Sequence, residues 1–162
     1  MKKSLGIAIA LIGVAVTSIA IVGVGPATVA RGDEPNPIIV LRQRLMDADG
    51  QAAALAVALM RGQVPYDATM AATAATIISN VYINMADLFP EGTDKGLGYN
   101  GPTKATPEIW KDKAGFKALI DKMVTDAKAA AAAAPKGKDA FAQAFAPVGQ
   151  NCQACHEKFR QS

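Results

Sequence analysis

Apolar residues recur at three- and four-residue steps in four stretches of the chain, which is the spacing of one face of an α-helix. None of these stretches alternates apolar and polar residues as a half-buried strand does. The predicted helices span residues 37–61, 67–88, 107–134 and 138–160. Short turns join the first pair and the last pair, and a loop of residues 89–106 joins the middle pair. This order predicts an all-α fold, an antiparallel up-down-up-down four-helix bundle.

The expected helix starts carry capping residues. Asn36 and Asp67 have short polar side chains that can accept a hydrogen bond from the first turn of a helix. Thr106 is expected to cap the third helix, because Pro107 follows it and suits the first helical position. These signals support the helix boundaries that the periodicity indicates.

Two of the predicted helices contain residues that disfavour a regular helix. Asp49-Gly50 interrupts the apolar pattern of the first helix and could loosen it. Pro147 and Gly149 are expected to bend or loosen the last helix one turn before Cys152.

Four methionines of the predicted helices are interpreted as core side chains, the usual role of this residue. They are Met60, Met70, Met85 and Met123.

Residues 1–30 have a composition of their own. Lys2 and Lys3 precede an uncharged, mostly apolar run over residues 5–24, and small residues that suit cleavage end at Ala30. The run is also long enough to cross a bilayer as a helix. Two interpretations therefore stay open, a secretory signal peptide and an uncleaved N-terminal membrane anchor. Both place the rest of the chain in the periplasm.

The remaining chain is expected to form one domain. Residues 31–36 contain two prolines and are interpreted as a linker, and residues 37–162 as a single four-helix domain. Lys2 and Lys3 account for two of the 17 basic residues, so 15 basic residues remain against 14 acidic ones. No basic patch of the nucleic-acid-binding type occurs, so we expect no nucleic-acid partner.

The C-terminal helix carries the chemistry of the chain. Cys152, Cys155 and His156 form a C-x-x-C-H run, the sequence signature of covalent c-type haem attachment. In a helix these three side chains share one face, so two thioethers can hold the porphyrin edge while the imidazole reaches the iron. They are the only cysteines and the only histidine of the chain. The motif predicts one covalent haem c near the C-terminus, with His156 as an iron ligand.

Other uses of the C-x-x-C-H run agree less well with the sequence. A thioredoxin-like pair requires a βαβ context, which the few residues after His156 cannot supply. A structural zinc site requires about four ligands, and only three Cys or His residues exist. A haem-free helical bundle with a coincidental motif is a third alternative. An export signal and a helical context both favour haem.

Several short segments resemble one family. These segments are Arg42–Met46, Gly62–Asp67, Leu88–Thr93, Pro107–Asp112 with Phe116, and Pro147–Gly149 before the haem motif. Together they resemble the cytochrome c′ superfamily, particularly its low-spin cytochrome c-556 branch. The resemblance covers roughly residues 42–160 and implies the bundle fold, one covalent haem c, and helices that can form a homodimer.

The resemblance also implies roles for individual residues. His156 is the sole histidine, so the sixth iron position is filled by methionine, by another weak donor, or by nothing. By resemblance Met46 faces the iron from the first helix, although a methionine there can also be core filler. Arg42 is expected to pair with a haem propionate or line the distal side, and Arg160 to lie near the proximal side. For both arginines, a solvated position on a helix face is the alternative.

The expected function follows from the iron ligands. Met/His ligation suits electron transfer, whereas an open sixth site permits small ligands to bind. We therefore expect a periplasmic cytochrome that carries single electrons between redox partner proteins. The alternative is a high-spin cytochrome c′ that binds NO or CO. The sequence offers no acid–base pair for catalysis, so an enzyme is not expected. Trp110 and Phe159 are expected to pack in the core and touch the porphyrin.

Overall fold

The computed structural model describes residues 34–161. The expected signal peptide or anchor, at residues 1–30, and the first linker residues, 31–33, lie outside this range. Within residues 34–161, every helix is too short or too polar to cross a membrane.

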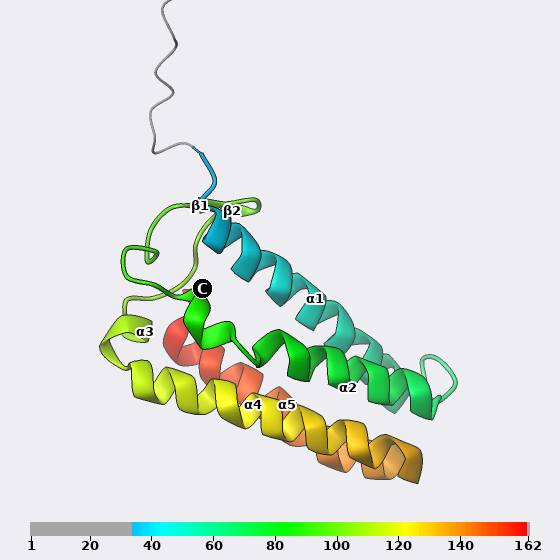
Figure 1. Ribbon diagram of the computed structural model, residues 1–162. Coiled ribbons are helices and arrows are strands. Elements are labelled where there is room, and N and C mark those ends of the chain that lie inside the picture. The colour runs from blue at the N-terminus through cyan, green and yellow to red at the C-terminus, as the bar shows by residue number, and fades with distance from the viewer. Residues whose placement is uncertain (1–33, 162) are drawn as a thin grey trace, which may run out of the picture. The chain divides into compact units, whose positions relative to one another are not determined.

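Four long helices form an antiparallel bundle, as the sequence predicts (Figure 1). They are α1 (Pro37–Met60), α2 (Ala68–Tyr82), α4 (Lys113–Ala133) and α5 (Lys138–Phe159). The smaller elements are the helices η1 (Met85–Leu88), α3 (Glu108–Lys111) and η2 (Ala134–Lys136) and the two-residue strands β1 (Leu97–Gly98) and β2 (Gly101–Pro102).

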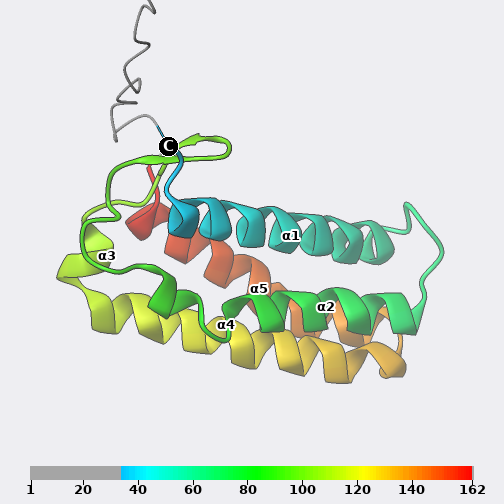
Figure 2. The same cartoon turned by 45° about the horizontal axis from the view of Figure 1, so that its top comes forward.

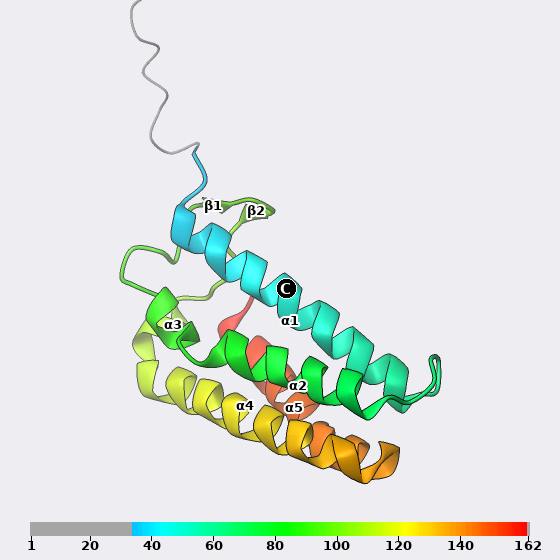
Figure 3. The same ribbon diagram turned by 45° about the vertical axis from the view of Figure 1, so that its right-hand side comes forward.

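The helix α2 packs against both α1 and α4, and α5 packs against α4 (Figure 3). Alanines on the facing sides of α2 and α4 are fully buried, which lets the two helices approach closely. These alanines are Ala71, Ala74, Ala75, Ala127 and Ala130. The buried phenylalanines lie on α5 and at the start of α4.

Two of the three expected caps are present. Asn36 Oδ1 accepts from the Ile38 N–H at 3.0 Å, and Asp67 Oδ1 accepts from the Met70 N–H at 2.7 Å. The expected cap at Thr106 is wrong, because its hydroxyl donates to the carbonyl of Lys158 instead. The hydroxyl binds a chain segment that only the folded bundle brings beside it.

The third predicted helix is two helices. The helix α3 ends after one turn, and Asp112 then begins α4 by accepting from the Gly115 N–H at 2.8 Å. A predicted helix over residues 107–134 is therefore wrong at Asp112. An aspartate is a better N-cap than a residue inside a helix, because its carboxylate competes for backbone donors.

The other expected boundaries need smaller corrections. The helix α2 ends at Tyr82 and the short η1 follows, because Asn84 leaves the helical region with φ −120°. The helix α1 continues through Asp49-Gly50, so the expected loosening does not occur. The helix α5 likewise runs through Pro147 without interruption.

The segment after η1 covers one end of the bundle and ties its first and last helices together. The Asn36 N–H donates to the Leu97 carbonyl at 2.7 Å, and the Gln161 N–H donates to the Lys104 carbonyl at 2.8 Å. Figure 2 shows this segment at the end of the bundle where α1 begins and α5 ends. A Cβ atom at Gly98 would collide with the end of the Gln43 side chain, which would have to move away from its partners Gly101 and Asn100.

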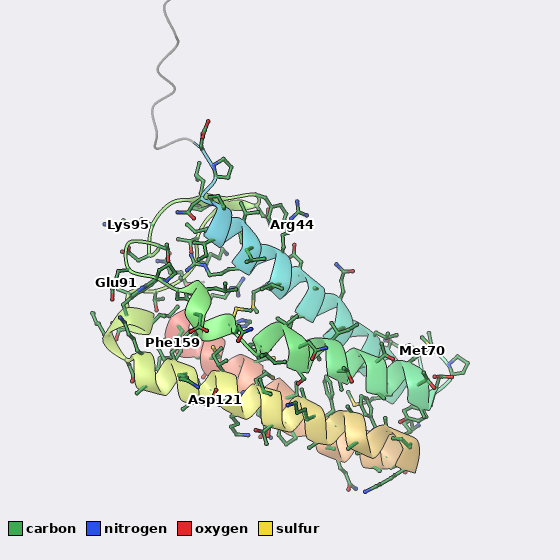
Figure 4. All side chains as sticks on the ribbon, in the orientation of Figure 1. Arg44, Met70, Glu91, Lys95, Asp121 and Phe159 are labelled. Atoms are coloured by element: carbon green, nitrogen blue, oxygen red, sulfur yellow. The ribbon has the colours of Figure 1, made fainter. Side chains whose placement is uncertain are left out.

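The methionines expected in the core divide into two groups. Met85 and Met123 are fully buried and Met60 is partly buried, as expected. Met70 is 44% exposed, so its assignment to the core is wrong. It lies on α2 at the end of the bundle opposite Phe159 (Figure 4).

Candidate haem site

A cavity of about 490 Å³ lies between the first half of α1 and the last turns of α5. Its volume is within the range of cofactor and small-molecule sites. The loop after η1 and the start of α4 complete its walls. The residues that line the cavity include Arg42, Met46, Asp49, Tyr82, Cys155, His156, Phe159 and Arg160. Arg42 and Met46, near the start of the domain, and Cys155, His156 and Arg160, near its end, therefore line one cavity. The sequence predicts that these residues bind the haem or its iron.

The C-x-x-C-H motif lies on the cavity side of α5. Cys155 and His156 line the cavity directly, and Cys152 is partly buried one turn earlier. Burial raises the pKa of both thiols to about 11, and the Asp49 carboxylate adds to this effect at Cys152. Both cysteines are therefore protonated near neutral pH.

His156 lies at the mouth of the cavity. Burial lowers its pKa, and the positive charge of Arg160 lowers it further. The neutral imidazole that results is the form that binds a metal.

One face of α1 lies across the cavity from the motif. Arg42, Met46 and Asp49 stand at positions i, i+4 and i+7 of that helix, and all three line the cavity. Met46 is partly buried and packs at the edge of the core. The structure therefore brings Met46 and His156 to the same cavity from opposite helices.

Arg42 is buried, with 5% of its surface exposed, so its interpretation as a solvated helix-face residue is wrong. Its Nη2 donates to the Thr93 carbonyl at 2.8 Å, and its Nη1 donates to the Thr93 hydroxyl at 3.1 Å and to the Leu88 carbonyl at 3.4 Å. Its guanidinium carbon lies 4.4 Å from the centre of the Phe89 ring. No carboxylate within residues 34–161 pairs with it.

Arg160 lies at the other side of the cavity mouth. It is exposed, its N–H donates to the His156 carbonyl at the end of α5, and its backbone bridges to Ala105. This position places a positive charge close to His156, and a haem-binding role for Arg160 stays a prediction.

Aromatic rings close the bottom of the cavity. The Phe116 ring stacks edge-on against Phe89 and Phe159, with centroid distances of 4.9 and 5.1 Å. Phe159 is buried and lines the cavity. Trp110 packs on Phe89 and donates its indole N–H to the Pro90 carbonyl, but it is not part of the lining.

Two site residues were not expected from the sequence. Asp49 is buried, and Tyr82 donates its hydroxyl to Asp49 Oδ2 at 3.3 Å inside the cavity wall. The helical period gave a usable signal for Asp49, because it follows Met46 by three residues and Arg42 by seven. No local signal exists for Tyr82, which lies on a different helix.

The family model described as Cytochrome C' matches residues 38–160. The chain belongs to the cytochrome c′ family.

Its relatives include both branches of the superfamily. The cytochrome c′ of Rubrivivax gelatinosus is 38% identical over 107 residues, which cover 64% of this chain and 78% of that protein. The cytochrome c-556 of Agrobacterium fabrum is 32% identical over 119 residues, covering 74% of this chain and 77% of that protein. The crystal structure of cytochrome c′ from Thermochromatium tepidum superposes with a TM-score of 0.72 at 30% identity, covering 81% of this chain and 99% of that one.

As in the other cytochromes of this family, the cofactor is one covalent haem c with its iron. The residues of the cavity fit this group. Two free thiols one helical turn apart can form the thioethers, and a neutral histidine follows them directly. Arg42 adds a buried positive charge that no carboxylate in residues 34–161 balances, which suits an anionic propionate.

Proposed function

We propose that this cytochrome c′ family member carries single electrons in the periplasm, with its iron ligated by His156 and Met46. The observation that carries the proposal is the position of Met46. It lines the same cavity as His156 and comes from the opposite helix, four residues after the buried Arg42. A thioether on that side fits the sixth position of an iron held by His156.

The side chains have separate roles in this proposal. Cys152 and Cys155 fix the cofactor to α5, and His156 and Met46 set the electronic state of the iron. When bound, the haem supplies the iron that gains and loses the electron. Ligation of that iron by Met and His raises its reduction potential and suits electron transfer. Arg42 and Arg160 are proposed to neutralise propionate charge on the distal and proximal sides.

A high-spin cytochrome that binds NO or CO at an open sixth site is the second candidate. Two observations favour it. The helix α1 is continuous through Asp49-Gly50, so no local break helps Met46 to reach the iron. The Rubrivivax gelatinosus relative, named a cytochrome c′, also has a higher identity than the cytochrome c-556 relative.

Replacement of Met46 distinguishes the two candidates. If the Met46-bound form holds about 99% of the ferrous protein, Met46→Ala raises the apparent CO affinity about 100-fold. The variant should also lose the methionine–iron absorption band and become high-spin. Met60→Ala, at the end of the same helix and outside the cavity, is the matched control and should leave the spectrum unchanged. A wild-type protein that is already high-spin and binds CO rapidly contradicts the electron-carrier proposal.

We propose that the partners are redox proteins at the inner membrane and that two copies of the chain associate through α1 and α2. Exposed apolar side chains on these helices support the association, among them Leu41, Met70 and Ile77. Sedimentation of the purified holoprotein should give a dimer, and Ile77→Lys should shift it towards the monomer. A wild-type monomer at high concentration contradicts this part of the proposal.

A further inference from the structure

Asp49 is a buried acid that haem attachment and iron ligation do not use. It is 7% exposed, lines the haem cavity from α1, and accepts one hydrogen bond, from the Tyr82 hydroxyl at 3.3 Å. Its second oxygen, Oδ1, is buried and has no hydrogen-bond partner among residues 34–161. A buried oxygen without a partner is costly when ionised, and protonation would relieve that cost.

The groups around Asp49 do not neutralise it. On α2 the neighbour is Tyr82, and on α5 it is Cys152, whose thiol, like that of Cys155, becomes an uncharged thioether once the haem is attached. The cavity residues of α4 are Phe116 and Ile120, which carry no charge. The other charged or titratable residues of the cavity are Arg42, Asp47, Lys104, His156 and Arg160.

Within residues 34–161, no ion pair links Asp49 to Arg42, Lys104 or Arg160. Arg42, two turns away on the same helix, donates its guanidinium hydrogens to Thr93, Thr103 and Leu88. Burial raises the pKa of Asp49 to about 6, and the hydrogen bond from Tyr82 offsets part of this effect. Asp49 therefore changes its charge close to neutral pH.

We propose that Asp49 binds a proton when the haem is reduced and releases it when the haem is oxidised. An external one-electron donor supplies the electron that converts Fe(III) to Fe(II). Asp49 takes one proton from water, forming the O–H bond of a carboxylic acid, and no bond of the cofactor breaks. The carrier would thus move a proton, or a fraction of one, with each electron.

The physical reason is electrostatic. Reduction removes one positive charge from the cavity, and in a site shielded from water this raises the proton affinity of a nearby carboxylate. By the same coupling, the negative charge of ionised Asp49 disfavours reduction of the iron. The reduction potential should therefore be high below the pKa of Asp49 in the oxidised protein and fall as the pH rises through the interval between its two pKa values.

The test is the midpoint potential of the holoprotein, measured by optical redox titration from about pH 4 to about pH 8. For one electron and one proton the slope approaches about −59 mV per pH unit. Asp49→Asn keeps the shape of the side chain and removes its proton, so it should flatten the slope and raise the potential at the alkaline end. Asp139→Asn removes an exposed charge in the first turn of α5, outside the cavity lining, and should keep the slope.

A second measurement does not depend on any variant. In wild-type protein labelled with 13C-aspartate, the reduced-minus-oxidised infrared spectrum should contain a band of a protonated carboxyl that shifts with the label. A missing band overturns the proposal, as does a pH-independent potential or an Asp49→Asn variant with the wild-type slope. If Asp49→Asn fails to fold, the labelled spectrum decides alone.

The inference rests on the haem cofactor and not on ligation by Met46. Its failure can therefore be separated from that of the proposed function. The spin state and the methionine–iron band report on Met46, whereas the pH slope and the carboxyl band report on Asp49. A high-spin protein with a strong pH slope would refute the first proposal and support the second.

Discussion

Arg42→Ala is expected to lower the free energy of unfolding by about 3 kcal/mol. The guanidinium is buried and donates to four acceptors, which are the carbonyls of Leu88 and Thr93 and the hydroxyls of Thr93 and Thr103. Truncation removes the Arg42 donors from the two Thr93 oxygens, whose hydrogen bonds are buried, and removes the contact with the Phe89 ring, whereas the Thr103 hydroxyl still accepts from the Ala105 N–H. The segment that covers the haem cavity would keep its hydrogen bonds to Asn36 and Gln43 but lose those to Arg42.

Urea unfolding of the ferric holoprotein measures this loss, and amide hydrogen exchange locates it. Exchange should accelerate in residues 88–103 and change little in α4. Arg44→Ala is the matched control, because Arg44 is exposed on the same helix and its guanidinium lies 3.7 Å from the centre of the Tyr99 ring in the loop. We expect the control to cost less than about 1 kcal/mol. An Arg42→Ala protein as stable as the control would show that the loop does not depend on Arg42.

Phe141→Ala is expected to cost about 4 kcal/mol of stability without altering the haem spectrum. Its side chain is fully buried, and its ring lies 5.4 Å from that of Phe145 and 6.3 Å from that of Tyr66. Removing the ring leaves a cavity in the core beside Tyr66 and Phe145. Phe141 lies in the first turn of α5, away from the haem motif in its last turns, so the iron ligands should stay in place.

The measurement is a urea titration followed both by far-ultraviolet circular dichroism and by haem absorption. Coincident transitions at lower urea would support the expected result. Ile83→Ala serves as the control, because Ile83 is 54% exposed and its truncation should cost about 0.5 kcal/mol. A changed spectrum in folded Phe141→Ala would mean that the two ends of α5 are coupled.

Much of the candidate site could be predicted from local patterns. The C-x-x-C-H spacing identifies Cys152, Cys155 and His156 within a single helical turn, and no other part of the chain is needed to place them on one face. The same period on the first helix aligns Arg42 and Met46. The caps at Asn36 and Asp67 were also predicted correctly, because each involves donors two or three residues away.

Predictions from the sequence were wrong where a residue has a hydrogen-bond partner far away along the chain. Thr106 was expected to cap a helix, but the folded chain places the Lys158 carbonyl beside it, 52 positions later. Asp49 was expected to weaken α1, but Tyr82 reaches it from α2 and the helix continues. A propensity weighs only neighbours along the chain, and tertiary contacts of this kind outweigh it.

By itself, the sequence determined the four helices, the covalent haem motif and the face of the first helix that carries Met46. Only the tertiary structure decided that Arg42 is buried under the loop, with partners 46 to 61 residues away. It alone decided that Asp49 meets Tyr82 at the wall of the haem cavity. The reason is physical. Helical period, capping and ligand spacing depend on atoms within a few residues, whereas burial and the charge state of an acid depend on which segments the fold brings around it.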